Sequence, residues 1–229
     1  CAAPLSLPDV RPFVAVLRWC GGIGTYMKAS SESHVDAGDR TNDAVRVNAR
    51  DVRARVIGEG ANLGVTQRAR VEYALAGGRM NTDSIDNSAG VDCSDHEVNI
   101  KILLDVLVVQ NKLTMRSRNA LLKRMTDEVG TLVLWDNYEQ TLAISIIQAR
   151  GTDLVDHQIR LMRMLEKADR LSREVEFLPD DETLTERAIG GQGLTRPEVS
   201  VLLSYSKIWL FDELLASDIP DDPFLVRDL

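Results

Sequence analysis

The sequence predicts an α/β fold in which a partial parallel sheet is followed by an all-α region. Short β-branched runs alternate with helical patterns as far as about Val109. This alternation is typical of strand–helix–strand units that form parallel sheets. From about Leu113 the strand patterns stop, and apolar residues recur only at helical spacing. We therefore expect two domains, residues 1–112 and residues 113–229.

Three segments of the first half have the composition of strands. They are Phe13–Trp19, Arg53–Asn62 with its strand ending at Gly58, and Arg79–Asn87. Apolar, β-branched runs bounded by glycine or asparagine are typical of strands. Three strands are too few for a complete doubly wound sheet, so we expect only part of one.

Helical patterns follow these strands. Thr66–Gly78 predicts a helix that its two final glycines stop, and Ser94–Asn111 predicts a long helix. A weaker helical pattern covers Asp43–Ala54. The polar segment Lys28–Asp43 before it favours a loop.

The second half is predicted to be entirely helical. Helical periodicity covers residues 116–150 and 154–177. A third helix is expected to begin at a capping box formed by Thr195 and Glu198, with Pro197 in its first turn.

Composition and charge narrow the possible functions. A net charge of -8 and a pI of about 5.0 argue against a nucleic-acid surface, which would be basic. No apolar run reaches the ~18 residues that a membrane span needs. Three cysteines without a CxxC spacing indicate neither a disulfide framework nor a zinc site, and Cys93 with His96 supplies too few ligands for any metal. We expect a cytoplasmic protein with a small-molecule ligand and no metal.

Glycine-rich or polar stretches follow each predicted strand. They are Gly21–Gly24, Gly58–Asn62 and Asn87–Ser94. Open parallel sheets bind ligands beyond the carboxyl ends of their strands, so these stretches predict a ligand crevice. A GxGxxG phosphate turn is absent from the sequence, and the first stretch taken alone favours a simple turn.

The third stretch has two interpretations. Ser94 and Glu97 are spaced as a capping box, which explains them as the start of a helix. The small residues Ser88–Gly90 let a ligand approach the backbone, and free amides at a helix start favour a carboxylate. Both interpretations stay open. The loop Gly58–Gly64 also has two: a flexible connection between a strand and a helix, or a crevice loop in which Asn62 offers its amide to a cofactor.

Long stretches of the chain resemble a known family. Residues 21–48, 56–83 and 85–104 resemble the large NAD-specific glutamate dehydrogenases of bacteria, and residues 193–223 resemble the helical C-terminal region of that family. The resemblance implies a Rossmann-like NAD-binding domain in the first 112 residues. It also implies oxidative deamination of L-glutamate to 2-oxoglutarate and ammonia, with hydride transfer to NAD, in a homo-oligomeric full-length enzyme.

Two short motifs are also similar to those of the smaller hexameric glutamate dehydrogenases. Glu59–Asn62 matches their Glu-Gly-Ala-Asn, and Asn87–Val91 matches their Asn-Ala-Gly-Gly-Val except at the second and third positions. Carried over residue by residue, the resemblance implies that Asn62 and Asn87 contact NAD. It also places Asn87 near the substrate.

The resemblance implies three further assignments. Ser94 matches the family serine that holds the side-chain carboxylate of the substrate, and Gly21 and Gly22 match small residues that line the cofactor crevice. The family's catalytic lysine and aspartate match no segment here. We therefore expect no catalytic residue in this chain, which would be the inactive C-terminal fragment of a larger enzyme.

Two alternatives remain. In one, the chain is a non-enzymatic helical module for assembly or regulation, and its α/β remnant is passive. In the other, it belongs to a Rossmann-type enzyme that uses a nucleotide without hydride chemistry.

Overall fold

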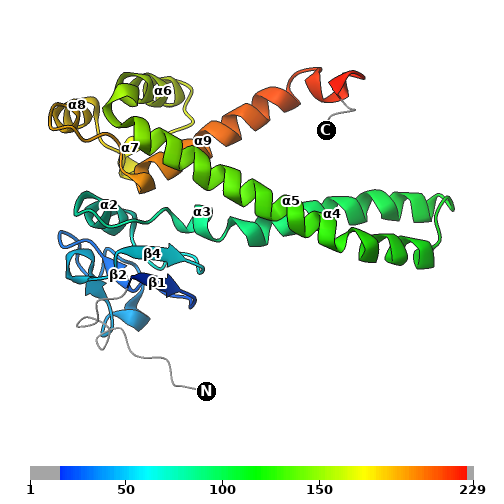
Figure 1. Ribbon diagram of the computed structural model, residues 1–229, viewed down its shortest axis with the longest axis horizontal. Helices are drawn as coiled ribbons and strands as arrows, with labels where there is room; N and C mark the ends of the chain where they lie inside the picture. Colours follow the sequence, from blue (N-terminus) through cyan, green and yellow to red (C-terminus); the bar gives the residue numbers. More distant parts are fainter. Residues whose placement is uncertain (1–15, 226–229) are drawn as a thin grey trace.

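Two pairs of parallel strands form the β part of the chain. The computed structural model describes residues 16–225. In it, β1 (Leu17–Cys20) pairs with β4 (Val56–Glu59), and β2 (Met27–Lys28) pairs with β3 (Val47–Asn48). Both pairs lie at one end of the molecule, below the helices in Figure 1.

The other regular elements of the described chain are helices. The helices in chain order are α2 (Gln67–Leu75), α3 (Asp83–Asp86), α4 (Ser88–Val109), α5 (Met115–Arg150), α6 (Val155–Lys167), α7 (Arg173–Glu176), α8 (Asp181–Ile189) and α9 (Arg196–Leu215). Four 3-10 turns are η1 (Arg40–Asn42), η2 (Ala49–Asp51), η3 (Gly151–Leu154) and η4 (Ile219–Asp221). None of the helices within residues 16–225 combines the length and hydropathy that a membrane span requires.

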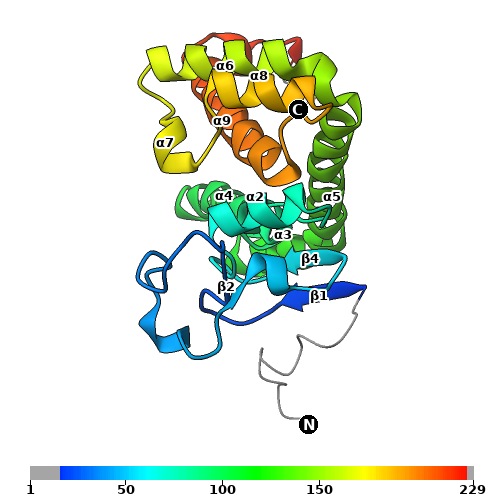
Figure 2. The ribbon, with the colours of Figure 1, turned by 90° about the vertical axis from the view of Figure 1, so that its left-hand side faces the viewer.

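The helices form layers on one side of the strands. Figure 2 shows α2 and α3 next to β4, with α9 beyond them and α6 and α8 farthest from the strands. Helices α4 and α5 pack along each other as a long hairpin that extends away from the strands (Figure 1).

Several predicted elements are confirmed. The parallel pairing of β1 with β4 confirms the parallel sheet, and β4 ends at Glu59, one residue after the predicted end. Helix α2 and the all-α second half are also as predicted. The capping box at Thr195 and Glu198 is present at the start of α9. The first three residues of the predicted strand Phe13–Trp19 lie outside the described residues.

The predicted helix at Asp43–Ala54 is wrong, because the segment forms β3 and η2. The Arg46 side chain is buried, and its Nε donates to the carbonyl oxygen of Thr25 at 2.8 Å. Val47 then pairs with Met27. Partners about twenty residues away therefore fix this backbone, against a weak local helical pattern.

The predicted strand at Arg79–Asn87 is also wrong. Only one bridge forms, between Arg79 and Val56, and the chain then turns into α3. The turn lets the Asp86 carboxylate accept a hydrogen bond from the backbone N–H of Glu59 at 2.9 Å. Ile85 becomes buried on a helix rather than on a strand.

Helix α4 begins at Ser88, six residues before the predicted start at Ser94. The pattern Ser94–Glu97 therefore lies inside a helix and caps nothing. The Glu97 carboxylate pairs instead with Lys101 four residues later. The helix start, with its free amides, is next to Asn87.

The two halves have separate hydrophobic cores. One cluster lies around the strands and α2, and its buried members are Cys20, Met27, Ala29, Val47, Ala49, Ile57, Val65, Ala69, Tyr73 and Met80. The other joins α3, α5, α6, α8 and α9, and its buried members include Ile85, Ile144, Met162, Leu165, Leu184 and Val199. The chain passes from the first core to the second between Met80 and Ile85.

A buried ion pair joins β4 to α2. The Glu59 side chain is fully buried, and its carboxylate accepts hydrogen bonds from Arg70 Nε at 2.7 Å and Nη2 at 3.0 Å. Arg70 also pairs with Asp83 of α3 at 3.1 Å. Burial raises the pKa of Glu59, while the hydrogen bonds and charge of Arg70 oppose this shift.

We expect Glu59→Gln to lower the free energy of unfolding by about 3–5 kcal/mol, because it leaves Arg70 buried without one of its two anions. Urea denaturation of the variant measures this loss. Glu97→Gln is the control, since its ion pair with Lys101 is exposed and is expected to contribute less than about 1 kcal/mol. Equal losses in the two variants would contradict the role of the buried pair.

The Tyr205 hydroxyl on α9 donates to the Glu176 carboxylate on α7 at 2.7 Å. Burial, followed by this hydrogen bond and the Glu176 charge, raises the pKa of Tyr205 to about 12. The folded-state pKa therefore exceeds the unfolded value of about 10. The resulting stability is complete below the unfolded pKa and is lost as pH rises through the folded pKa.

We predict that Tyr205→Phe makes stability less dependent on pH between about pH 10 and about pH 12, because the ionising group is gone. Chemical denaturation at several alkaline pH values measures the slope. Tyr138→Phe serves as the control, since this tyrosine is 56% exposed. An unchanged slope in Tyr205→Phe would contradict the assignment.

Candidate functional site

The carboxyl ends of β1 and β4 meet at one edge of their sheet. Cys20 and Glu59, the last residues of the two parallel strands, lie opposite each other. Gly21 and Gly22 follow β1 directly, and Gly60–Asn62 follows β4. Helix α4 also begins close to this edge, because Asn87, the residue before it, contacts Asn62. All three predicted site stretches therefore begin in one region.

Trp19 explains two glycines of this edge. A Cβ atom on Gly58 would lie 2.5 Å from Trp19 Cε3, and one on Gly60 would lie 2.5 Å from Trp19 Nε1. The indole therefore lies against the backbone of β4 and the residue after it. Packing of this indole is sufficient to explain both glycines, so no ligand is needed to explain them. The sequence pattern did not reveal this contact.

A direct contact joins the second and third predicted stretches. The Asn87 amide Nδ2 donates a hydrogen bond to Asn62 Oδ1. The loop that carries Asn62 is held in place by the Asp83 carboxylate, which accepts from the backbone N–H of Leu63 at 2.7 Å. Leu63 has a φ of +59°, in the left-handed region. The two asparagines predicted to contact NAD are thus neighbours.

A cavity of about 780 Å³ lies between α4, α5 and α9, and both asparagines line part of it. Ser88 forms part of its wall: its hydroxyl donates to Asn137 Oδ1 at 2.6 Å and accepts from Gln140 Nε2 at 3.0 Å. These bonds fix the first turn of α4 against α5. The position of Asn87 therefore depends on the helical hairpin.

The charges on this cavity wall are mostly negative. The acidic residues that line it are Asp92, Asp95, Asp136 and Glu139, whereas Lys207 is the one basic residue among the lining residues. Nearby Asp136 contributes, after burial, to a raised pKa of Asp92. An anionic ligand would be repelled here, so this cavity is unsuitable for a dicarboxylate.

Ser94 lies on a different part of α4. It is exposed and does not line the cavity. Seven residues separate it from Asn87, which is about two helical turns, so both lie on one side of the helix. The structure thus brings Asn62 and Asn87 together and leaves Ser94 on an open surface two turns further along.

Partly buried polar side chains connect this region to the helical half. Asp86, which accepts the Glu59 N–H, also accepts from Asn81 Nδ2 at 2.8 Å. Asn81 Oδ1 in turn accepts from Nε of Arg196, the first residue of α9, at 3.0 Å. Burial raises the pKa of Asp86. Sequence reasoning missed this network, because 115 residues separate Asn81 from Arg196.

One group of side chains contains residue types that bind metals. The ligand atoms of Asp92, His96 and Asp136 lie within 4.8 Å of one another. His96 Nε2 is 3.4 Å from Asp92 and 3.6 Å from Asp136. These contacts are sufficient to explain the group as a link between α4 and α5. Cys93, considered with His96 from the sequence, is not part of it.

The observed fold defines a class of protein: an α/β chain whose polar loops lie at the carboxyl edge of parallel strands, next to a helical hairpin. The family described as "Bacterial NAD-glutamate dehydrogenase, catalytic domain" matches residues 11–147. The family described as "Glutamate dehydrogenase, C-terminal" matches residues 191–229. The chain belongs to the bacterial NAD-glutamate dehydrogenase family, which confirms the resemblance seen in the sequence.

Curated relatives carry the same family name. The chain is 58% identical over 213 residues to the NAD-specific glutamate dehydrogenase of Pseudomonas aeruginosa, 53% over 211 to that of Halomonas elongata, and 51% over 208 to that of Mycobacterium tuberculosis. These matches cover 93%, 92% and 90% of the chain. The chain spans 13% of the length of each relative.

We expect Gly60→Ala to destabilise the protein by about 0.5–1.5 kcal/mol, because its Cβ would overlap the Trp19 indole and push this exposed side chain off its rotamer. In a Trp19→Ala background the same change is expected to cost much less, so a double-mutant cycle measures the contact. Gly130→Ala on α5 is the control: its Cβ meets open space, and alanine in a helix is favoured by about 0.5–1 kcal/mol. Additive losses at positions 19 and 60 would contradict the packing.

Proposed function

We propose that this chain forms part of an NAD-dependent glutamate dehydrogenase, and that the carboxyl edge of β1 and β4, with the start of α4, receives NAD and L-glutamate. The reaction is oxidative deamination of glutamate to 2-oxoglutarate and ammonia, with hydride transfer to NAD. Family membership supports the reaction, and the contact between Asn62 and Asn87 supports the location.

The proposed cofactor contacts come from two loops and a helix start. The amides of Asn62 and Asn87 can donate to and accept from NAD once their mutual hydrogen bond is exchanged. Gly21 and Gly22 are exposed at the same edge, where small side chains allow close approach. The bound cofactor accepts the hydride, and the protein supplies the geometry.

The proposed substrate position lies along the open side of α4. Asn87 and Ser94 are about 10 Å apart along the helix axis at a rise of 1.5 Å per residue. This length accommodates the nicotinamide ring near Asn87 and the side-chain carboxylate of glutamate near Ser94. The acidic cavity between α4, α5 and α9 is lined by Asn87 but not by Ser94, and its negative charges disfavour the substrate carboxylate there.

We also propose the finer architecture. A Rossmann-like arrangement for residues 1–112 is supported by the parallel pairing of β1 and β4, with polar loops at their carboxyl edge. The division at residue 112 stays a prediction: it falls in the turn between α4 and α5, while the catalytic-domain match continues to residue 147.

We predict that Ser94→Ala in the complete enzyme raises the KM for glutamate about tenfold or more, since a hydrogen bond to a charged group contributes about 1.5–3 kcal/mol. The KM for NAD is expected to stay unchanged. Asn62→Ala is expected to have the opposite effect, raising the KM for NAD. Steady-state kinetics with each substrate varied in turn measures both.

Cys93→Ala is the control for this series, because Cys93 is the exposed neighbour of Ser94 on α4. Both KM values should match those of the wild type in this variant. An unchanged KM for glutamate in Ser94→Ala would overturn the proposed substrate position.

A role in assembly is a second candidate function, and one observation favours it. The α4–α5 hairpin exposes large apolar side chains, including Leu134 at 72% and Trp135 at 57% exposure. Trp135 and Tyr138 lie with ring centroids 5.6 Å apart, beside a surface hollow. Exposed apolar patches of this kind are typical of protein interfaces, so we propose that the complete enzyme forms homo-oligomers through this hairpin.

A further inference from the structure

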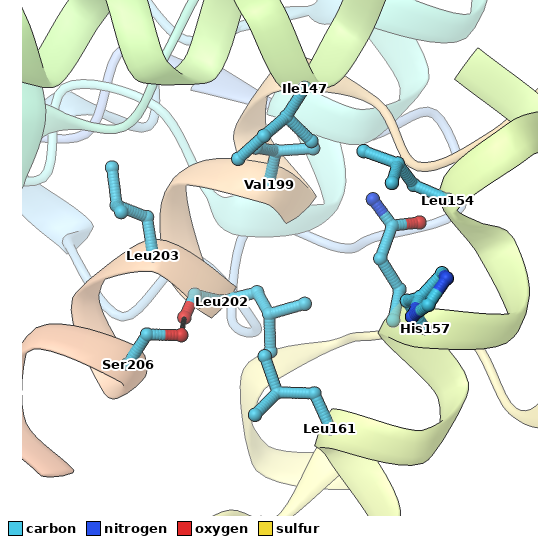
Figure 3. Close-up of a pocket in the computed structure, with 9 residues that line it drawn as sticks. Ile147, Leu154, His157, Leu161, Val199, Leu202, Leu203 and Ser206 are labelled. Carbon is cyan, nitrogen blue, oxygen red and sulfur yellow. Dashed lines mark hydrogen bonds between the residues drawn. The ribbon is translucent and has the colours of Figure 1, made fainter. Parts of the chain in front are cut away.

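A smaller cavity lies among the helices of the second half. Its volume is about 160 Å³, and it is bounded by the end of α5, the turn η3, α6 and the first half of α9 (Figure 3). The lining residues are Ile147, Leu154, His157, Gln158, Leu161, Val199, Leu202, Leu203 and Ser206. Most are aliphatic, and none is Asp, Glu, Lys or Arg. The cavity therefore suits a neutral, mainly apolar molecule.

Two of its three polar residues already have partners. The Ser206 hydroxyl donates to the carbonyl oxygen of Leu202 at 2.8 Å. The Nδ1 atom of His157 lies 3.1 Å from the guanidinium of Arg160, outside the cavity. Neither side chain is left in need of a ligand.

Gln158 is different. Its side chain lines the cavity, the residue is only 7% exposed, and no residue in the described part of the chain gives its Oε1 atom a hydrogen bond. A buried amide oxygen without a partner costs about 1–3 kcal/mol. Such groups are rare in folded proteins and call for a partner that the chain itself does not supply.

A water molecule is a poor candidate for that partner. Buried waters need two to four polar neighbours, and apolar cavities of about 150 Å³ stay dry and accept benzene-sized molecules. This cavity has that size, and Gln158 is its one polar group with an unpartnered buried atom among the described residues. A ligand with an apolar body can fill the aliphatic part and bond to the amide at the same time.

We propose that this cavity is a binding site for a small neutral molecule with one apolar ring or branched chain and one hydroxyl-type group, which pairs with Gln158. The Oε1 atom is itself buried, so a ligand bonds to it only after a half-turn about the terminal torsion, which exchanges the oxygen and nitrogen of the amide. A hydroxyl group both donates and accepts, so it meets the amide in either orientation. The site is independent of the proposed dehydrogenase site, because no residue is shared between the two proposals.

Phenol and benzene are the probes, because they share the ring and differ by one hydroxyl. Saturation-transfer NMR titrations on the complete protein that carries this chain measure their dissociation constants. We expect both to bind, with phenol about fivefold tighter, since a neutral hydrogen bond contributes about 1 kcal/mol. Absence of binding, which would also result if another protein segment fills the cavity, overturns the proposal.

Two variants test separately how the apolar cavity and the hydrogen bond to the hydroxyl contribute to binding. Leu161→Phe fills the cavity and is expected to abolish binding of both probes. Gln158→Leu keeps the apolar walls, so benzene should bind as before while phenol loses its fivefold advantage. Leu210→Phe, at a position on α9 that is 60% exposed, is the control and should leave both affinities unchanged.

Two outcomes with the variants overturn the proposal. Binding that survives Leu161→Phe would place the probes elsewhere. A phenol advantage that survives Gln158→Leu would remove the amide from the site, and this second variant is informative even if Leu161→Phe fails to fold.

Discussion

The carboxylate of Glu59 is buried where β4, α2 and α3 meet. The charge and hydrogen bonds of Arg70 offset the free-energy cost of burying it. A buried charge without a partner costs several kcal/mol, so the two side chains must stay together. The requirement has a geometric consequence. It fixes the direction in which the chain leaves β4, and hence the loop that carries Asn62.

The same region is tied to the helical half through neutral and charged hydrogen bonds. Asp86 accepts from the backbone of Glu59 and from Asn81, and Asn81 accepts from Arg196 at the start of α9. Asn87 follows Asp86 directly, so its position is determined by both halves. A packed, satisfied polar network of this kind holds side chains more precisely than apolar contacts alone.

Helix α4 separates two chemically different surfaces near the proposed site. Its side toward α5 and α9 is acidic, and it includes the group of Asp92, His96 and Asp136 that links two helices. Ser94 is exposed and does not line this cavity. The packing of α4 against α5 and α9 therefore decides which side of this helix faces the acidic residues.

The sequence by itself determined the family, the strands that form β1 and β4, the all-α second half and the capping box at Thr195, because each depends on local pattern or on long matching stretches. It also singled out Asn62 and Asn87, whose contact the structure supplies. Their roles, and that of Ser94, stay predictions.

Only the tertiary structure decided the segments 43–54 and 79–87 and the true start of α4. In each, a distant partner overrides a weak local preference: Thr25 for Arg46, the Glu59 amide for Asp86, and Asn137 for Ser88. Periodicity records which residues are apolar and how they are spaced, but it contains no information about which buried polar group will meet which. That pairing is settled only when separate elements pack, because a buried donor or acceptor must find its partner wherever the chain brings one.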